Sequence, residues 1–137
     1  MNSYGLVAVK AAHQLIGSQT ADAEWAWQKA AREAFPAGSS SIDKGCPRGA
    51  FLGLCKRGVI VGARACFELS DTKNGDCACR AWKALKEQPE LAGDRRSLWA
   101  RVHADATNEN GQLDVVLALW GAGLLVGAPG EDEPEAR

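Results

Sequence analysis

The sequence predicts an all-α protein, and two observations carry that prediction. Apolar residues recur with a period near 3.6 along most of the chain, as at Tyr4, Val7 and Ala11, which fall on one face of a helix. Glycine and proline residues interrupt this pattern and divide it into about six helical segments. With 137 residues, of which 46% are apolar, the chain is long enough for one domain with its own core.

The first three expected helices are delimited by capping and breaking residues. The first covers residues 4–16 and ends where a Gly-Ser pair follows. Thr20 is expected to cap the second helix, which Pro36 stops near residue 35 because proline cannot continue a helix. Pro47 is expected to be the first residue of the third helix, and Gly58 suits the left-handed position at its end.

Three further helices are expected in the second half of the chain. The fourth runs from about residue 73 to residue 88, and Asp94 is placed to cap the fifth. The sixth covers about residues 112–122. Short apolar runs at residues 59–61 and 124–126 follow the third and sixth helices, and each either extends along the core or forms a brief strand.

An internal repeat links the two halves of the chain. Residues 51–63 align with residues 116–128 at an offset of 65, and both segments contain a helix end, a glycine, an apolar run and a Gly-Ala pair. We therefore predict a single helical domain over residues 1–128, made of pseudo-repeats at about 4–63 and 74–128. These two three-helix halves are expected to pack about a pseudo-twofold axis, and the alternative is chance similarity between Ala- and Leu-rich helices.

Charge and cysteine content indicate the class and compartment of the protein. The net charge of −1 combines a basic stretch at residues 44–64 with an acidic tail at residues 129–137, which is expected to be disordered. This balance does not suit a dedicated nucleic-acid binder. Five cysteines without an export signal indicate reduced thiols and a cytoplasmic location, and no apolar run is long enough to span a membrane.

Cys46 is the strongest candidate for chemistry. It lies between a glycine and Pro47, so we expect it at the N-cap of the third helix, where the helix dipole stabilises a thiolate or an anion. Lys44 and Arg48 add positive charge and complete a candidate anion-binding set. A nucleophilic thiol needs a base, and His103 is the candidate. The alternative is an inert capping thiol.

The start of the sixth helix is a second polar corner. By the repeat, Asn110 and Gln112 correspond to the Cys46 corner, so the two helix starts are candidates to frame a ligand-binding groove or are ordinary caps. No metal site is expected, because Cys77 and Cys79 are two residues apart on a helix and point away from each other. No cofactor is expected either.

Several segments resemble a known family. Residues 44–55 and 110–120, together with residues 8–11 and 27–31, are similar to a family of small bacterial helical proteins described as a domain of unknown function. The resemblance covers most of residues 4–126. It implies a small cytoplasmic bacterial protein with no established activity or ligand.

The sequence favours a non-enzymatic protein-interaction module. Trp25 lies off the apolar face that contains Trp27, so it is a candidate interface residue for a protein partner or a homo-oligomer. One alternative is a thiol or anion-binding site at Cys46. Another is weak nucleic-acid binding through residues 44–64, although the apolar residues of that stretch favour burial. No membrane association is expected.

Overall fold

The structure is a computed structural model that describes residues 3–16, 22–102 and 108–129. Within these residues the chain forms α-helices joined by two short 3-10 helices, which confirms the all-α prediction. In chain order the elements are α1 (Ser3–Ile16), α2 (Ala23–Ala34), η1 (Ser40–Asp43), α3 (Gly45–Arg57), α4 (Lys73–Glu87), η2 (Pro89–Gly93), α5 (Arg95–Val102) and α6 (Gln112–Gly121).

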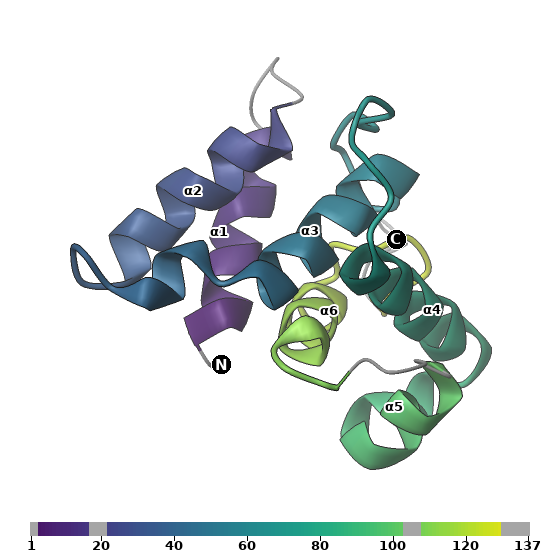
Figure 1. The fold of residues 1–137 in the computed structure, drawn as a ribbon. Helices are drawn as coiled ribbons and strands as arrows, with labels where there is room; N and C mark the ends of the chain where they lie inside the picture. Colours follow the sequence, from purple (N-terminus) through teal and green to yellow (C-terminus); the bar gives the residue numbers. More distant parts are fainter. Residues whose placement is uncertain (1–2, 17–21, 103–107, 130–137) are drawn as a thin grey trace.

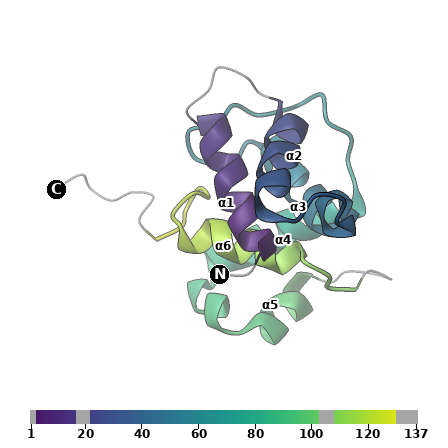
Figure 2. The same ribbon diagram turned by 90° about the vertical axis from the view of Figure 1, so that its left-hand side faces the viewer.

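The helices are arranged around α6. Figures 1 and 2 show α1 and α2 side by side as a hairpin, α3 crossing α4, and α5 against the far part of α4. Helix α6 contacts α1, α3 and α4, so its apolar side chains complete the core. Trp27 and Phe51 are fully buried there, with ring centroids 5.3 Å apart. This core therefore joins residues from the first and second halves of the chain.

Helix α2 has a different cap from the one predicted. Asp22, rather than Thr20, is the N-cap, and its carboxylate accepts a hydrogen bond of 3.0 Å from the backbone N–H of Trp25. A carboxylate at this position also interacts favourably with the helix dipole. Thr20 lies outside the described residues, as does the predicted acidic tail beyond residue 129. The left-handed end of α3 at Gly58 is confirmed, with φ of 76°.

Helix α3 begins earlier than predicted. Its N-cap is Lys44, so Cys46 lies inside the first turn, and the prediction that Cys46 is the N-cap was wrong. Pro47 is the third helical residue. Because backbone N–H groups in a first turn have no acceptor within the helix, proline is tolerated there without loss of a hydrogen bond.

Helices α3 and α4 cross where each carries a glycine. A Cβ atom placed on Gly53 would lie 2.2 Å from the Cα atom of Gly75. One turn earlier on α3, a Cβ atom on Gly49 would lie 2.9 Å from the Cβ atom of Asn74. The two backbones therefore approach more closely than any pair of larger residues permits.

The two apolar runs lie against each other. Ile60 and Leu125 form an isolated antiparallel β-bridge, and backbone hydrogen bonds of 2.8 and 2.9 Å flank it. Both side chains are buried. The pairing of residues 59–61 with residues 124–126 thus answers the question that the sequence left open, with a single bridge instead of extended strands in the described residues.

Backbone hydrogen bonds at the ends of α3 and α6 recur at the offset of 65. The N–H of Val59 donates to the carbonyl of Leu54 at 3.3 Å, and the N–H of Leu124 donates to that of Leu119 at 2.9 Å. This match concerns the segments that follow the two helices. The duplication of complete three-helix halves stays a prediction.

The glycine crossing gives a direct stability prediction. We expect Gly53→Ala to lower the free energy of unfolding by about 3 kcal/mol, because the added methyl group forces α3 and α4 apart. Gly121→Ala is the matched control, since a Cβ atom there meets nothing within 4 Å. The control is expected to be neutral or to stabilise by up to about 1 kcal/mol. Urea unfolding compares both, and equal midpoints would contradict the close crossing.

Candidate functional site

An open cleft lies between the second half of α3, the segment that follows it and the first half of α4. Its volume is about 530 Å³, and Gly53 and Gly75 are among its lining residues. A Cβ atom on Gly53 would meet the backbone of Gly75, so these two glycines mark the place where the helices touch at the cleft. The cleft therefore lies beside the contact of α3 with α4.

A short turn forms one rim of this cleft and exposes an aromatic ring. The N–H of Leu69 donates to the carbonyl of Cys66 at 3.2 Å and closes the turn. Phe67 lies within the turn and is 77% exposed, the largest value among the exposed large apolar side chains of the described residues. An aromatic ring this exposed makes few contacts that stabilise the folded chain.

The side chain of Lys56 stabilises this turn by hydrogen bonds to its backbone. Its ammonium group donates to the carbonyl of Phe67 at 3.2 Å and to the carbonyl of Leu69 at 2.6 Å. The Asp71 carboxylate lies 3.8 Å from the same nitrogen. Hydrogen bonds to a charged donor are stronger than neutral ones, so the turn is fixed while the ring of Phe67 faces solvent.

One cysteine lines the cleft, and its thiol is not activated as a nucleophile. Cys79 is buried, and its Sγ atom donates to the carbonyl of Gly53 at 3.6 Å. Burial raises the pKa of the Cys79 thiol above its usual value, although Arg57 and Lys83 act in the opposite direction. The thiol therefore stays protonated near neutral pH and is a poor nucleophile.

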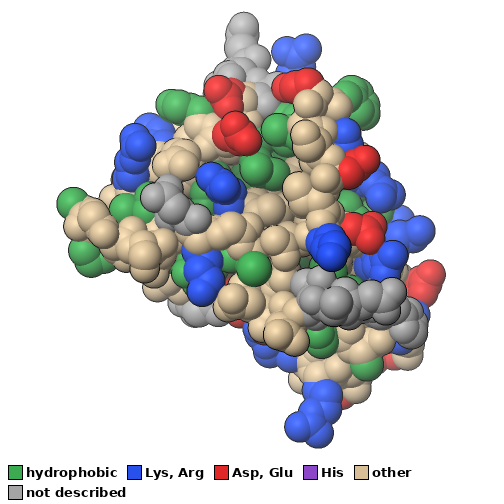
Figure 3. Space-filling view, in the orientation of Figure 1, with side chains coloured by type: hydrophobic (Ala, Val, Ile, Leu, Met, Phe, Trp, Pro, Cys, Tyr) green, Lys and Arg blue, Asp and Glu red, His purple; other side chains and the backbone are tan. Residues whose placement is uncertain are grey.

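Charged side chains surround the cleft. Arg57 and Asp76 line it and are exposed, and Asp76 also forms an ion pair of 3.1 Å with Arg80. Lys and Arg side chains gather over α4 and the adjacent end of α3, with Asp and Glu side chains among them (Figure 3). The cleft thus combines an aromatic rim with both signs of charge, which suits binding by contact and charge pairing.

The structure brings together the two helix starts that the sequence singled out. A Cβ atom on Gly111 would lie 3.3 Å from the ring of Pro47, so the starts of α3 and α6 are in contact. Lys44 is exposed at this corner, and Cys46 and Arg48 are half-buried. His103, the candidate base, lies outside the described residues.

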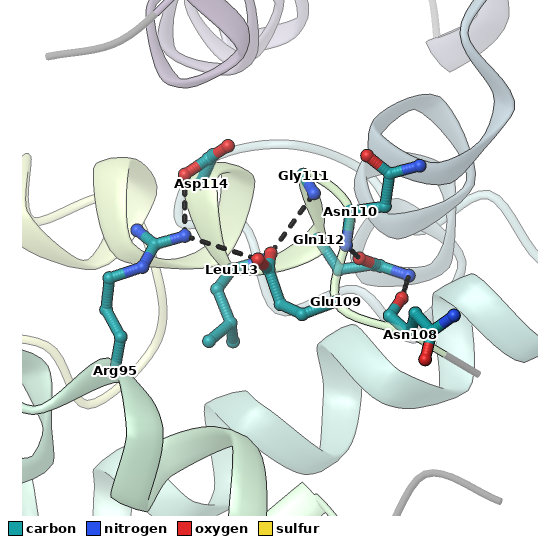
Figure 4. A network of polar contacts seen from close by, with 8 residues as sticks. All are labelled: Arg95, Asn108, Glu109, Asn110, Gly111, Gln112, Leu113 and Asp114. Carbon is teal, nitrogen blue, oxygen red and sulfur yellow. Dashed lines mark hydrogen bonds and ion pairs between the residues drawn. The ribbon is translucent and has the colours of Figure 1, made fainter. Parts of the chain in front are cut away.

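Gln112 is enclosed within the protein at this corner. Its side chain is completely buried, and its Nε2 atom donates to Asn74 Oδ1 at 2.9 Å and to the carbonyl of Asn108 at 3.3 Å. Its Oε1 atom accepts from the N–H of Asn110 (Figure 4). Both ends of the amide are thus engaged within the protein.

The Glu109 carboxylate caps α6. Its Oε2 atom accepts from the N–H groups of Gly111 and Leu113, each at 3.1 Å (Figure 4). Arg95 lies 3.6 Å from the Glu109 carboxylate and 2.8 Å from that of Asp114. These contacts tie the start of α6 to α5 and leave Asn110 with an exposed side chain.

The sequence pattern singled out one of the two exposed aromatic residues and missed the other. Trp25 is 45% exposed on the first turn of α2, where its position off the apolar face had singled it out. Phe67 was missed, because it falls in residues 63–71, which have no helical period. One feature of the sequence could have indicated it: a large apolar residue beside an acidic residue in a segment without helical periodicity.

The described part of the chain contains neither a metal-binding cluster nor a membrane-spanning helix. No group of three or more His, Cys, Asp or Glu side chains that could hold a metal ion occurs there. No helix of that part combines the length and the apolar character that crossing a membrane requires.

The structure is thus a small all-α fold with an open cleft. Residues 1–126 match the model of a family described as a family of unknown function, DUF6979, and the chain belongs to this family. No curated protein and no solved structure matches the chain. Because the family carries no assigned activity, its function has to be argued from the site.

The buried amide of Gln112 predicts a stability effect. We expect Gln112→Leu to lower the free energy of unfolding by about 2 kcal/mol, because Asn74 and the N–H of Asn110 lose their buried partner. Asn110→Ala is the control, since it keeps that N–H and removes only an exposed side chain. The control is expected to change the value by less than about 0.5 kcal/mol. A Gln112→Leu variant as stable as the control would show that the network contributes nothing.

Thiol accessibility gives a second prediction for this site. Cys46 is half-buried, whereas Cys55, Cys66, Cys77 and Cys79 are buried. We expect an aromatic disulfide reagent to modify Cys46 first, at least about tenfold faster than the other thiols, because these react only after local opening. Peptide mapping identifies the modified residue, and the same reaction in urea is the control in which all thiols react. Initial modification at Cys77 or Cys79 would contradict the burial seen here.

Proposed function

We propose that this protein is a non-enzymatic interaction module that binds a segment of a partner protein at the cleft between α3 and α4. The observation that carries the proposal is that the Phe67 side chain is 77% exposed, on a turn that hydrogen bonds from Lys56 stabilise. A rigid aromatic side chain loses little conformational entropy on binding and buries a large apolar area. Residues with these properties are typical anchors of protein interfaces.

The chemistry of the cleft supports binding over catalysis. The buried Cys79 thiol has a raised pKa and donates to a backbone carbonyl, so it lacks the activation that a nucleophile needs. Lys56 is already engaged by two carbonyl groups and a carboxylate. These side chains support recognition by shape and charge.

The lining residues indicate the partner segment. Its apolar side chain would cover Phe67, and a carboxylate on the same segment would pair with the exposed Arg57. A basic group on the partner segment would pair with Asp76, which also lines the cleft. We therefore expect a short segment with an apolar residue next to charged ones.

Other surfaces remain separate proposals. Trp25, 45% exposed, supports an interface on α2 as the sequence suggested. The half-buried Cys46 beside Arg48 supports an anion site at the start of α3. We place Phe67 first, because it is the more exposed aromatic residue and lines a cleft.

A peptide-binding experiment separates Phe67 from Trp25. Peptides selected from a random phage-displayed library against the wild-type protein are expected to lose at least about tenfold in affinity with Phe67→Ala. Leu6→Ala is the matched control, since Leu6 is 41% exposed on α1 and is expected to leave the affinity unchanged. Fluorescence anisotropy with labelled peptides measures the dissociation constants.

Two results would contradict this assignment. One is loss of peptide binding with Trp25→Ala and not with Phe67→Ala, which would move the interface to α2. The other is a concentration-dependent dimer in sedimentation velocity that Phe67→Ala abolishes while no peptide binds. That result would make a second copy of the chain the partner.

A further inference from the structure

Two cysteines lie together beneath the turn that carries Phe67. Cys55 is in the last turn of α3, and Cys66 is the residue before Phe67. Both are thiols in this structure, and they are 2% and 0% exposed. The N–H of Cys66 donates to the carbonyl of Cys55 at 3.0 Å, so the chain returns to the helix end at this residue.

The backbone geometry suits a covalent link between these residues. A direct N–H···O=C bond keeps the two Cα atoms within about 5–6 Å, inside the range that a disulfide spans. Both side chains belong to the same buried cluster. Burial raises the pKa of Cys55 well above its usual value, and the neighbouring Cys66 raises it further, as expected for sulfur atoms within electrostatic reach.

We propose that Cys55 and Cys66 form an intramolecular disulfide when the protein meets a small disulfide oxidant such as oxidised glutathione. The thiolate of Cys66 attacks one sulfur of the oxidant, forming a mixed disulfide and releasing one glutathione thiolate, which takes up the proton. The thiolate of Cys55 then displaces the second glutathione. The protein loses two hydrogen atoms and two glutathione thiols are released, so atoms and electrons balance.

Cys66 is the better first nucleophile of the two. Burial and the nearby carboxylates of Glu68 and Asp22 raise the pKa of Cys66, and a hydrogen bond from the backbone N–H of Ala23 to its sulfur partly counteracts this, whereas the pKa of Cys55 is raised well above its usual value. It also lies in a turn, whereas Cys55 is inside a helix. The turn must open for the oxidant to reach Cys66, and the bonds from Lys56 to the carbonyls of Phe67 and Leu69 oppose that opening.

The disulfide would join the end of α3 to the turn beside the cleft. It would fix covalently what Lys56 fixes by hydrogen bonds, and hold Phe67 in its exposed position. This inference goes beyond peptide binding and does not depend on it, because the link forms from the protein and the oxidant alone.

Peptide mapping tests the link directly. The full-length protein carrying Cys46→Ser, which removes the accessible thiol, is incubated with oxidised glutathione and digested with trypsin without reduction. We expect one linked pair, the tryptic peptides 49–56 and 65–73, and an intact mass lower by two hydrogen atoms. In that background Cys66→Ala abolishes the link, and Cys79→Ser, which removes another buried thiol, leaves its rate unchanged.

The rate of disulfide formation in a variant with a weakened turn is a second test, and it leaves both Cys55 and Cys66 in place. Lys56→Met is expected to speed formation of the link several-fold, since it removes two hydrogen bonds from the turn. The proposal is overturned if both thiols stay reduced in the folded protein under conditions that oxidise it in urea. It is also overturned if the linked peptides contain Cys77 or Cys79 in place of this pair.

Discussion

The close contact of α3 and α4 is the constraint on which the rest of the structure depends. Gly53 and Gly75 meet with no side chain between them, and the distance of 2.2 Å from an imagined Cβ atom to Gly75 Cα shows that none fits. This contact places the end of α3 beside the start of α4. The connecting segment must therefore return across the end of α3, where Cys66 bonds to the carbonyl of Cys55.

The candidate site follows from the same constraint. The cleft lies beside this contact, and the returning segment forms its rim with Phe67 at the turn. Lys56 fixes that rim with its ammonium group. Other contacts also join distant parts of the chain, namely the paired runs at residues 59–61 and 124–126 and the hydrogen bond from the buried Gln112 to Asn74. The proposed binding surface thus lies beside the contact of Gly53 with Gly75.

The sequence predicted the helices well, because a helix depends on residues close in the chain. The period near 3.6, the glycine after α3 and the proline after α4 each act locally. The cleft depends on which helices meet, and no local pattern shows that Gly53 faces Gly75. The ion pair of Glu109 with Arg95 likewise joins the start of α6 to another helix, so no local pattern predicts it. Phe67 was missed because it lies in a segment without a helical period.

Native-state hydrogen exchange tests the central role of the crossing most directly. If the contact of α3 and α4 holds the domain together, the amides of Leu54 and Cys79 exchange only when the whole chain unfolds. Their free energy of exchange then equals the free energy of unfolding measured with urea. The account is contradicted if these amides exchange through a smaller opening, several kcal/mol below that value, while α1 and α2 stay protected.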